Sequence, residues 1–139
     1  MIGAPFTLLG LDHVVLRVRG MAALERFYCE VIGCAVERRR EDLGLLHLRA
    51  GRSLIDLVDV AGPLGSSGGP PPGSEGHNVD HLCLRIDPFD AAAIADHLRR
   101  HGVAVEETGT RFGADGEGPS IYLLDPEGNR VELKGPPVA

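Results

Sequence analysis

The chain has 139 residues, of which 43% are hydrophobic and 24% are charged, and its formal net charge is −6. This size and composition predict a single globular domain and exclude a disordered chain. The one basic cluster, Arg38 to Arg40, is followed directly by Glu41 and Asp42. The sequence therefore offers no broad cationic face to nucleic acid, and we expect no nucleic-acid partner.

The cysteine pattern and the apolar runs limit where the protein is expected to act. Three cysteines, Cys29, Cys34 and Cys83, form no CxxC pair, which is not typical of a disulfide framework or a zinc ribbon. Residues 1–10 have no basic start, and nowhere is there a run of about 18 apolar residues of the kind a bilayer requires. We expect a cytoplasmic protein without a membrane partner.

A first module is predicted between about residues 10 and 60. Segment 12–18 has the alternation of a strand, and apolar residues at helical spacing follow it from Met21 to Val31. Gly33 then stands where a helix needs a left-handed C-terminal residue. Three short strands are expected after this helix, at roughly 34–40, 44–49 and 53–59.

A segment rich in glycine and proline follows the first module. Between residues 60 and 78, ten of nineteen residues are glycine or proline, a composition that cannot propagate a helix or a central strand. We interpret this segment as a linker that can also act as a mobile flap over one side of a binding site.

A second module, about residues 79 to 135, repeats the first. Residues 80–86 match residues 12–18 at a shift of 68, with four of seven positions identical and the other three apolar in both copies, which indicates a duplicated strand. A helical stretch from Ala91 to Leu98 ends at Gly102, and strands are expected at roughly 103–108, 119–124 and 130–134. The sequence therefore predicts an α+β fold of two pseudo-repeated βαβββ modules.

Four ligand-type side chains occupy equivalent positions in the two modules. His13 and His81 lie in the repeated strands, and Asp56 and Glu132 each stand between two branched apolar residues in the last strand of a module. Strand alternation turns the polar faces away from the helices, so we expect the four groups to meet around a pseudo-twofold axis. Imidazole and carboxylate ligands suit one divalent ion such as Zn, Ni, Mn, Fe or Co. Any one of these residues alone would most simply be structural, but four ionisable groups on an inward face are costly unless a cation satisfies them.

This pattern resembles the vicinal oxygen chelate superfamily, which includes glyoxalase I, fosfomycin resistance proteins, extradiol dioxygenases and bleomycin resistance proteins. The resemblance extends from about Leu11 to Gly135 and implies a cup-shaped mixed sheet, the glyoxalase-like fold. The motifs that carry it are Asp12-His13, Phe27-Tyr28 with Val31-Ile32-Gly33, Asp80-His81, and Ser120-Ile121-Tyr122 leading through Asp125-Pro126-Glu127-Gly128-Asn129 to Glu132.

The resemblance also implies roles for individual residues. His13, His81 and Glu132 match the shared metal triad, and Asp56 matches the fourth ligand of glyoxalase I, where a glutamate is usual. Arg17 is similar to an arginine that contacts the glutathione carboxylate in glyoxalase I. Ser120 and Tyr122 lie in a stretch similar to the substrate pocket of fosfomycin-hydrolysing relatives.

We therefore expect a metal-dependent lyase or isomerase of the lactoylglutathione-lyase type, acting on a small substrate with two neighbouring oxygens. Glu132 or Asp56 would move the proton between adjacent carbons. A homodimer is expected because two small sheets leave edges to be covered.

Three alternatives remain open. A fosfomycin-resistance-like enzyme that acts on an epoxide would have a threonine where Val15 stands. An extradiol dioxygenase would need a base histidine, for which His47 and His77 are candidates. A metal-free binding protein of the bleomycin-resistance type would suit the acidic charge, but such relatives generally lack the metal ligands.

Overall fold

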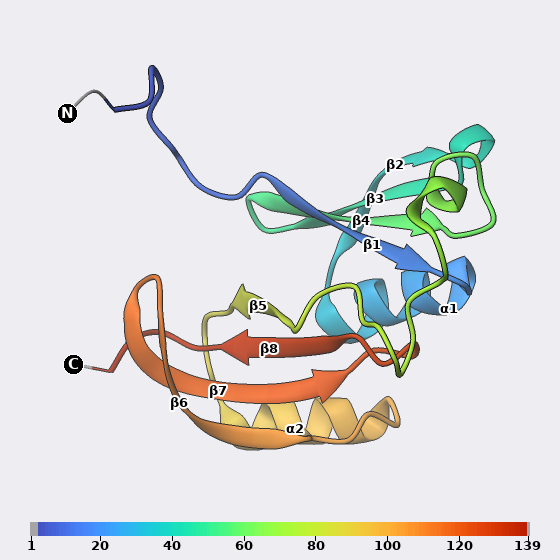
Figure 1. Ribbon diagram of the computed structural model, residues 1–139. Helices are drawn as coiled ribbons and strands as arrows, with labels where there is room; N and C mark the ends of the chain where they lie inside the picture. The colour runs from blue at the N-terminus through green and yellow to red at the C-terminus, as the bar shows by residue number, and fades with distance from the viewer. Residues whose placement is uncertain (1–2, 139) are drawn as a thin grey trace.

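Two four-stranded sheets form the body of the protein in the computed structural model, which describes residues 3–138 (Figure 1). The first module contains β1 (His13–Val18), α1 (Met21–Arg26), a π-helical turn η1 (Phe27–Ile32), β2 (Ala35–Arg40), β3 (Leu45–Ala50) and β4 (Ser53–Asp59). Its sheet has the order β1-β4-β3-β2, with β1 parallel to β4 and the other neighbours antiparallel.

The second module repeats this topology. It contains β5 (Leu82–Arg85), α2 (Ala91–Arg100), β6 (Glu107–Gly113), β7 (Gly116–Leu124) and β8 (Arg130–Lys134). Its sheet has the order β5-β8-β7-β6, again with a parallel first pair. The predicted α+β class and the two βαβββ modules are confirmed, and the strands form two separate sheets.

The strand register defines which residues of the two modules are equivalent. Asp56 on β4 lies opposite His47 on β3, and Glu132 on β8 lies opposite Tyr122 on β7. The two carboxylates are thus in equivalent positions, as the sequence repeat predicted. His47 and Tyr122 are equivalent as well, although their side chains differ.

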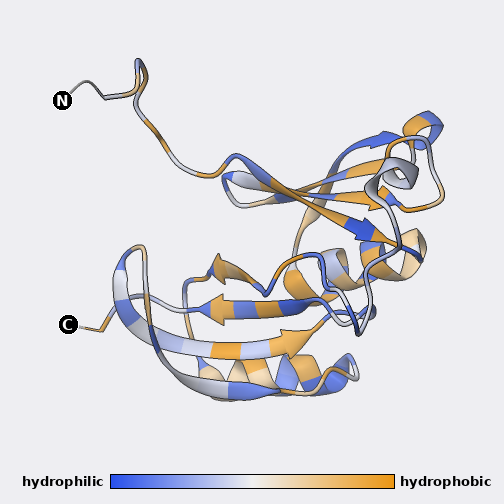
Figure 2. Cartoon of the chain, viewed as in Figure 1, coloured by the Kyte–Doolittle hydropathy of each residue, from blue (hydrophilic) through white to orange (hydrophobic). Residues whose placement is uncertain are grey.

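One hydrophobic core is shared by both modules. Along β1, Leu16 and Val18 are fully buried, whereas His13 and Val15 are exposed, so the predicted division of this strand into an apolar and a polar face is confirmed. The orange residues of Figure 2 mark the apolar positions of the strands and helices. The core cluster continues from the first sheet through the helices into β7 and β8.

A buried hydrogen bond ties the first helix to the second module. Tyr28, which is fully buried in η1, donates its hydroxyl to Asp125 Oδ2 at 2.7 Å. Burial and the neighbouring Asp125 carboxylate raise the pKa of Tyr28 far above its usual value, so the hydroxyl keeps its proton and remains a donor. Within residues 3–138, no helix is long and apolar enough to span a membrane.

Two elements differ from the sequence-based prediction. The first helix changes to a π-helical turn over Phe27–Ile32 before it ends at the left-handed Gly33, whose φ is 97°. The strand expected at 103–108 begins only at Glu107, because the backbone amide of Val103 still bonds to the carbonyl of Leu98 at the end of α2. Apolar residues after the helix belong to this turn, and their pattern alone does not distinguish them from a strand.

Candidate functional site

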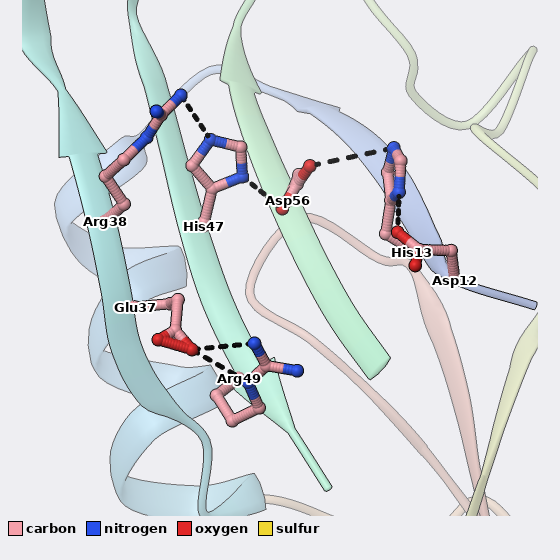
Figure 3. Close-up of polar contacts among 7 residues, drawn as sticks. All are labelled: Asp12, His13, Glu37, Arg38, His47, Arg49 and Asp56. Atoms are coloured by element: carbon pink, nitrogen blue, oxygen red, sulfur yellow. Dashed lines mark hydrogen bonds and ion pairs between the residues drawn. The ribbon is translucent and has the colours of Figure 1, made fainter. Parts of the chain in front are cut away.

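Asp56 lies between two histidines on the first sheet, and these three residues form what we call the first half-site (Figure 3). Asp56 is buried, with 4% of the residue exposed. His47 Nδ1 is 2.8 Å from Asp56 Oδ1, and His13 Nε2 is 4.0 Å from Asp56 Oδ2. The order of the strands explains this arrangement, because β4 lies between β1 and β3.

The residue before His13 fixes the orientation of its imidazole. His13 Nδ1 hydrogen-bonds to Asp12 Oδ2 at 2.8 Å, which turns Nε2 toward Asp56. The hydrogen bond to Asp12, followed by the charge of Asp56, raises the pKa of His13 above its ordinary value. A histidine held in this way by a carboxylate is the usual form of a metal ligand.

Arg38 extends the first half-site to the edge of the sheet. Its Nη2 is 3.4 Å from His47 Nε2. Because a guanidinium only donates, Nε2 accepts this bond, and the proton of His47 is on Nδ1, directed at Asp56. Sequence reasoning gave Arg38 no role and named His47 only as a candidate base, because neither has an identical counterpart in the second module.

The second half-site, which consists of His81, Ser120, Tyr122 and Glu132, has the same plan. His81 Nε2 is 3.2 Å from Glu132 Oε1, and the preceding Asp80 accepts a hydrogen bond from His81 Nδ1 at 2.6 Å. Ser120 donates its hydroxyl to Glu132 Oε2 at 2.6 Å. The two histidine and carboxylate pairs are therefore built alike.

The surroundings of Glu132 keep its carboxylate ionised. Burial raises the pKa of this group, but hydrogen bonds from Ser120 and Tyr122 and the charge of His81 outweigh that effect, so the pKa lies below its usual value. A buried carboxylate that stays negative is suited to bind a cation and to accept a proton.

Tyr122 is held between two arginines. The guanidinium of Arg130 lies 4.3 Å from the ring centroid and that of Arg111 lies 5.5 Å from it. Both arginines also pair with Glu107, at 2.7 Å and 3.4 Å respectively. The ring is thus fixed beside Glu132, although it is Ser120 that donates the shortest hydrogen bond to this carboxylate.

Lys134 is a buried cation that sequence reasoning gave no role. It follows Glu132 by two positions on β8, is 4% exposed, and donates to the Gly116 carbonyl at 2.9 Å. Lys134, His81 and Glu132 all line a cavity of about 280 Å³. Strand alternation places Lys134 on the same face of β8 as Glu132, and the structure adds that this lysine is buried.

The structure does not bring the two half-sites of one chain together. Among residues 3–138 there is no group of three or more His, Cys, Asp or Glu side chains that could hold a metal ion. The four predicted ligands therefore do not form one group among the described residues, and their convergence on one metal ion stays a prediction. Each sheet instead presents one pair, His13 with Asp56 and His81 with Glu132.

The donor atoms of each pair fit a divalent ion. Metal bonds to imidazole and carboxylate are about 2.0–2.2 Å long, so two ligands at right angles lie about 3 Å apart. The separation of 3.2 Å between His81 Nε2 and Glu132 Oε1 agrees with this value, and the separation of 4.0 Å between His13 Nε2 and Asp56 Oδ2 needs a shift of under ~1 Å. Each pair would supply two ligands of a coordination shell.

Arg17, which the resemblance matched to a substrate contact, faces the linker. Its guanidinium donates to the carbonyls of Gly65, Gly68, Gly69 and Pro70. The linker over residues 60–78 is therefore packed against β1 beside the first half-site.

A protein-family model also matches most of this chain. The model described as the Glyoxalase/Bleomycin resistance protein/Dioxygenase superfamily matches residues 10–133. The chain belongs to this superfamily. The resemblance inferred from the repeated Asp-His strands is thereby confirmed.

One relative matches most of the chain in both sequence and structure. The virulence protein STM3117 of Salmonella typhimurium strain LT2 is 29% identical over 124 residues, which are 88% of this chain and 81% of the relative. The crystal structure of STM3117 has a TM-score of 0.78 at 27% identity and covers 94% of this chain and 99% of its own.

Two further solved structures share the fold. A lactoylglutathione lyase from Agrobacterium tumefaciens has a TM-score of 0.66 at 22% identity and covers 92% of this chain and 94% of its own. TnmS3, an antibiotic binding protein from Streptomyces sp. CB03234, has a TM-score of 0.67 at 24% identity, with coverage of 94% and 98%. An enzyme and a binding protein thus have the same fold, so the function must be argued from the site.

Proposed function

We propose that the protein is a divalent-metal-dependent lyase or isomerase that acts on a small substrate with two neighbouring oxygens, and that its metal lies between two copies of the chain. One observation carries the proposal. Each sheet joins a histidine to a buried carboxylate, with the histidine anchored by the preceding aspartate. One chain supplies two such pairs but keeps them apart.

A two-fold dimer would complete the metal site. In such a dimer the first half-site of one copy faces the second half-site of the other, which gives two equivalent sites. The described segment before β1, residues 3–12, supports an assembly, because it extends away from the sheets (Figure 1) and its apolar side chains are exposed. Phe6, Leu8, Leu9 and Leu11 are 67 to 98% exposed, and an apolar group of this kind is typical of an interaction surface.

The chemistry follows from the arrangement of the ligands. His13, Asp56, His81 and Glu132 would hold the ion, which when bound polarises a substrate oxygen as a Lewis acid. Ser120 holds Oε2 of Glu132, so Oε1 faces the site. An ionised carboxylate in this position can take the proton from the carbon beside a carbonyl and return it to the adjacent carbon.

Metal content is the first test of the proposal. Elemental analysis of the protein, purified without added metal and again after addition of Ni, Co, Mn, Zn or Fe, should find about one ion per chain. Alanine at His13, His81 or Glu132 should lower this content sharply, and alanine at Asp56 should lower it less. His77→Ala, an exposed linker position, is the control. Full occupancy in a variant that lacks His13, His81 or Glu132 would refute the proposed site.

Turnover distinguishes the reaction classes. The loaded protein should isomerise a hemithioacetal, and it should leave epoxides and catechols unchanged. If the protein turned over an epoxide or a catechol but no hemithioacetal, the proposed lyase or isomerase activity would be wrong. A protein that holds no metal and binds a cationic small molecule tightly would instead be a binding protein.

A further inference from the structure

We propose that the cavity beside the first half-site receives an uncharged, apolar substituent of the substrate, and that Arg17 builds the wall of this cavity instead of contacting an anionic group. This inference names a substrate class for the proposed function and rests on it for the reaction. The cavity itself can be tested without metal and without turnover.

Every donor of Arg17 is already used. A guanidinium has five N–H groups. Nε and one N–H of Nη2 donate to the Gly65 carbonyl at 3.2 and 2.9 Å, and the other N–H of Nη2 donates to Gly69 at 2.8 Å. Nη1 donates to the carbonyls of Gly68 and Pro70 at 3.0 and 3.1 Å. No N–H of Arg17 is left for a substrate carboxylate.

The linker is shaped to hold this arginine. A Cβ at Gly68 would overlap the Arg17 side chain, and a Cβ at Gly65 would overlap the backbone carbonyl of Asp59. Asn78 fixes the backbone of Arg17, since its Oδ1 accepts from Arg17 N and its Nδ2 donates to Arg17 O, both at 3.0 Å. The glycines that the sequence suggested for a mobile flap thus serve close packing against β1.

The cavity that results has four aliphatic side chains in its lining, Val15, Leu45, Val58 and Leu64. Its volume is about 490 Å³, which suits a group of several heavy atoms. The lining consists of His13, Val15, Arg17, Leu45, His47, Asp56, Val58, Leu64, Gly65, Ser67 and Gly68. An alkyl or aryl group that enters this space would leave water for an apolar surface, which is favourable.

The charges around the cavity oppose an anionic substituent. Both histidines are already directed at carboxylates, His13 at Asp12 and His47 at Asp56. In the metal-free protein the buried Asp56 carboxylate would repel a second negative group, and with or without the metal Arg17 has no free donor to compensate for the water that such a group loses. The substrate class is therefore a vicinal-oxygen compound with a neutral apolar substituent, in place of a glutathione adduct whose carboxylate would contact Arg17.

A pair of fragments with the same shape tests this inference. Benzamide and benzoate differ in charge, and each can be titrated into the chelator-treated protein at pH 8. In ¹H–¹⁵N NMR spectra we expect benzamide to shift the amide signals of Val58, Leu64 and Gly65. Benzamide should also bind at least about tenfold more tightly than benzoate.

Substitutions at the wall provide the matched controls. Leu64→Arg adds a free cation and should reverse the preference toward benzoate, whereas Val105→Arg, at a comparably exposed position outside the cavity lining, should not. Arg17→Lys should weaken benzamide binding and speed amide hydrogen exchange in residues 65–69, because an ammonium has only three donors. Retained linker protection and unchanged benzamide binding in this variant would contradict the role given to Arg17.

The result separates this inference from the proposed function. Benzoate binding as tight as benzamide binding, or no binding of either fragment, would overturn the apolar cavity whatever the metal content. A protein that prefers benzamide but holds no metal would leave the cavity intact and refute the metal-dependent function instead.

Discussion

Two variants that each lack one half-site should restore metal sites when they are combined. The first variant carries His13→Ala and Asp56→Ala, and the second carries His81→Ala and Glu132→Ala. Alone, each variant has only one type of histidine and carboxylate pair. We expect each to hold little metal, because a single pair supplies two ligands where a divalent ion needs at least four.

The expected recovery follows from two-fold symmetry. If each site combines the first half-site of one chain with the second half-site of its partner, a hybrid dimer has one intact site and one that lacks all four ligands. Equal mixing with free exchange makes about half of the dimers hybrids, so about one quarter of the parent's sites return. A site formed within one chain would return none.

Differently tagged chains make the hybrid measurable. Co-expression followed by two affinity steps isolates hybrid dimers, in which elemental analysis should find about half of the parent's metal. A hybrid between the first variant and a chain that lacks both half-sites is the control and should hold none. Circular dichroism must show that the variants are folded. Hybrids with folded chains but no recovered metal would refute the shared site.

Three further predictions concern single residues. Glu132→Gln should abolish turnover and reduce metal content less than it reduces activity, because the amide is no proton acceptor; equal activity to the parent would exclude Glu132 as the base. Tyr28→Phe should lower the free energy of unfolding in urea by about 1–3 kcal/mol, because the buried Asp125 loses a donor; an unchanged urea midpoint would contradict this. His47→Ala should weaken metal binding through Asp56, and His47→Gln should restore part of it; equal affinity in both variants would show that His47 does not position Asp56.

Much of the fold could be predicted because the sequence repeats itself. The strands at 53–59 and 130–134 have the predicted bounds, since branched apolar residues flank a carboxylate in both and turn residues limit them. The π-helical turn at Phe27–Ile32 could not be predicted, because one residue more per turn leaves the apolar spacing nearly unchanged. The strand expected to begin at 103 begins only at Glu107 for a similar reason. Val103 is an apolar residue of the turn that ends α2, and it packs against the core there.

The candidate ligands could also be predicted, but their assembly could not. The repeat places His13 with His81 and Asp56 with Glu132, and each histidine does face its carboxylate. A repeat carries no information on whether two polar faces meet within a chain or between chains. That choice depends on how the sheets pack, which periodicity does not specify.

The sequence repeat alone did not place His47 and Tyr122 beside the carboxylates, because the modules diverge at these positions. His47 and Tyr122 occupy equivalent register positions, yet one is an imidazole and the other a phenol. Comparison of the two halves detects only shared residues, so it passes over both. The antiparallel pairing of β3 with β4 is what reveals that His47 belongs beside Asp56.

This divergence gives the two half-sites different parts in the proposed reaction. Asp56 is one methylene shorter than Glu132, and its distance to the paired histidine is 4.0 Å against 3.2 Å. The first half-site also adjoins the apolar cavity, whereas the second contains the ionised Glu132 with its Ser120 donor. A substrate whose apolar substituent enters the cavity beside the first half-site would thus present its oxygens and its acidic carbon to Glu132. In the proposed reaction the shorter aspartate would serve mainly to complete the coordination of the ion, and the longer glutamate would accept the proton.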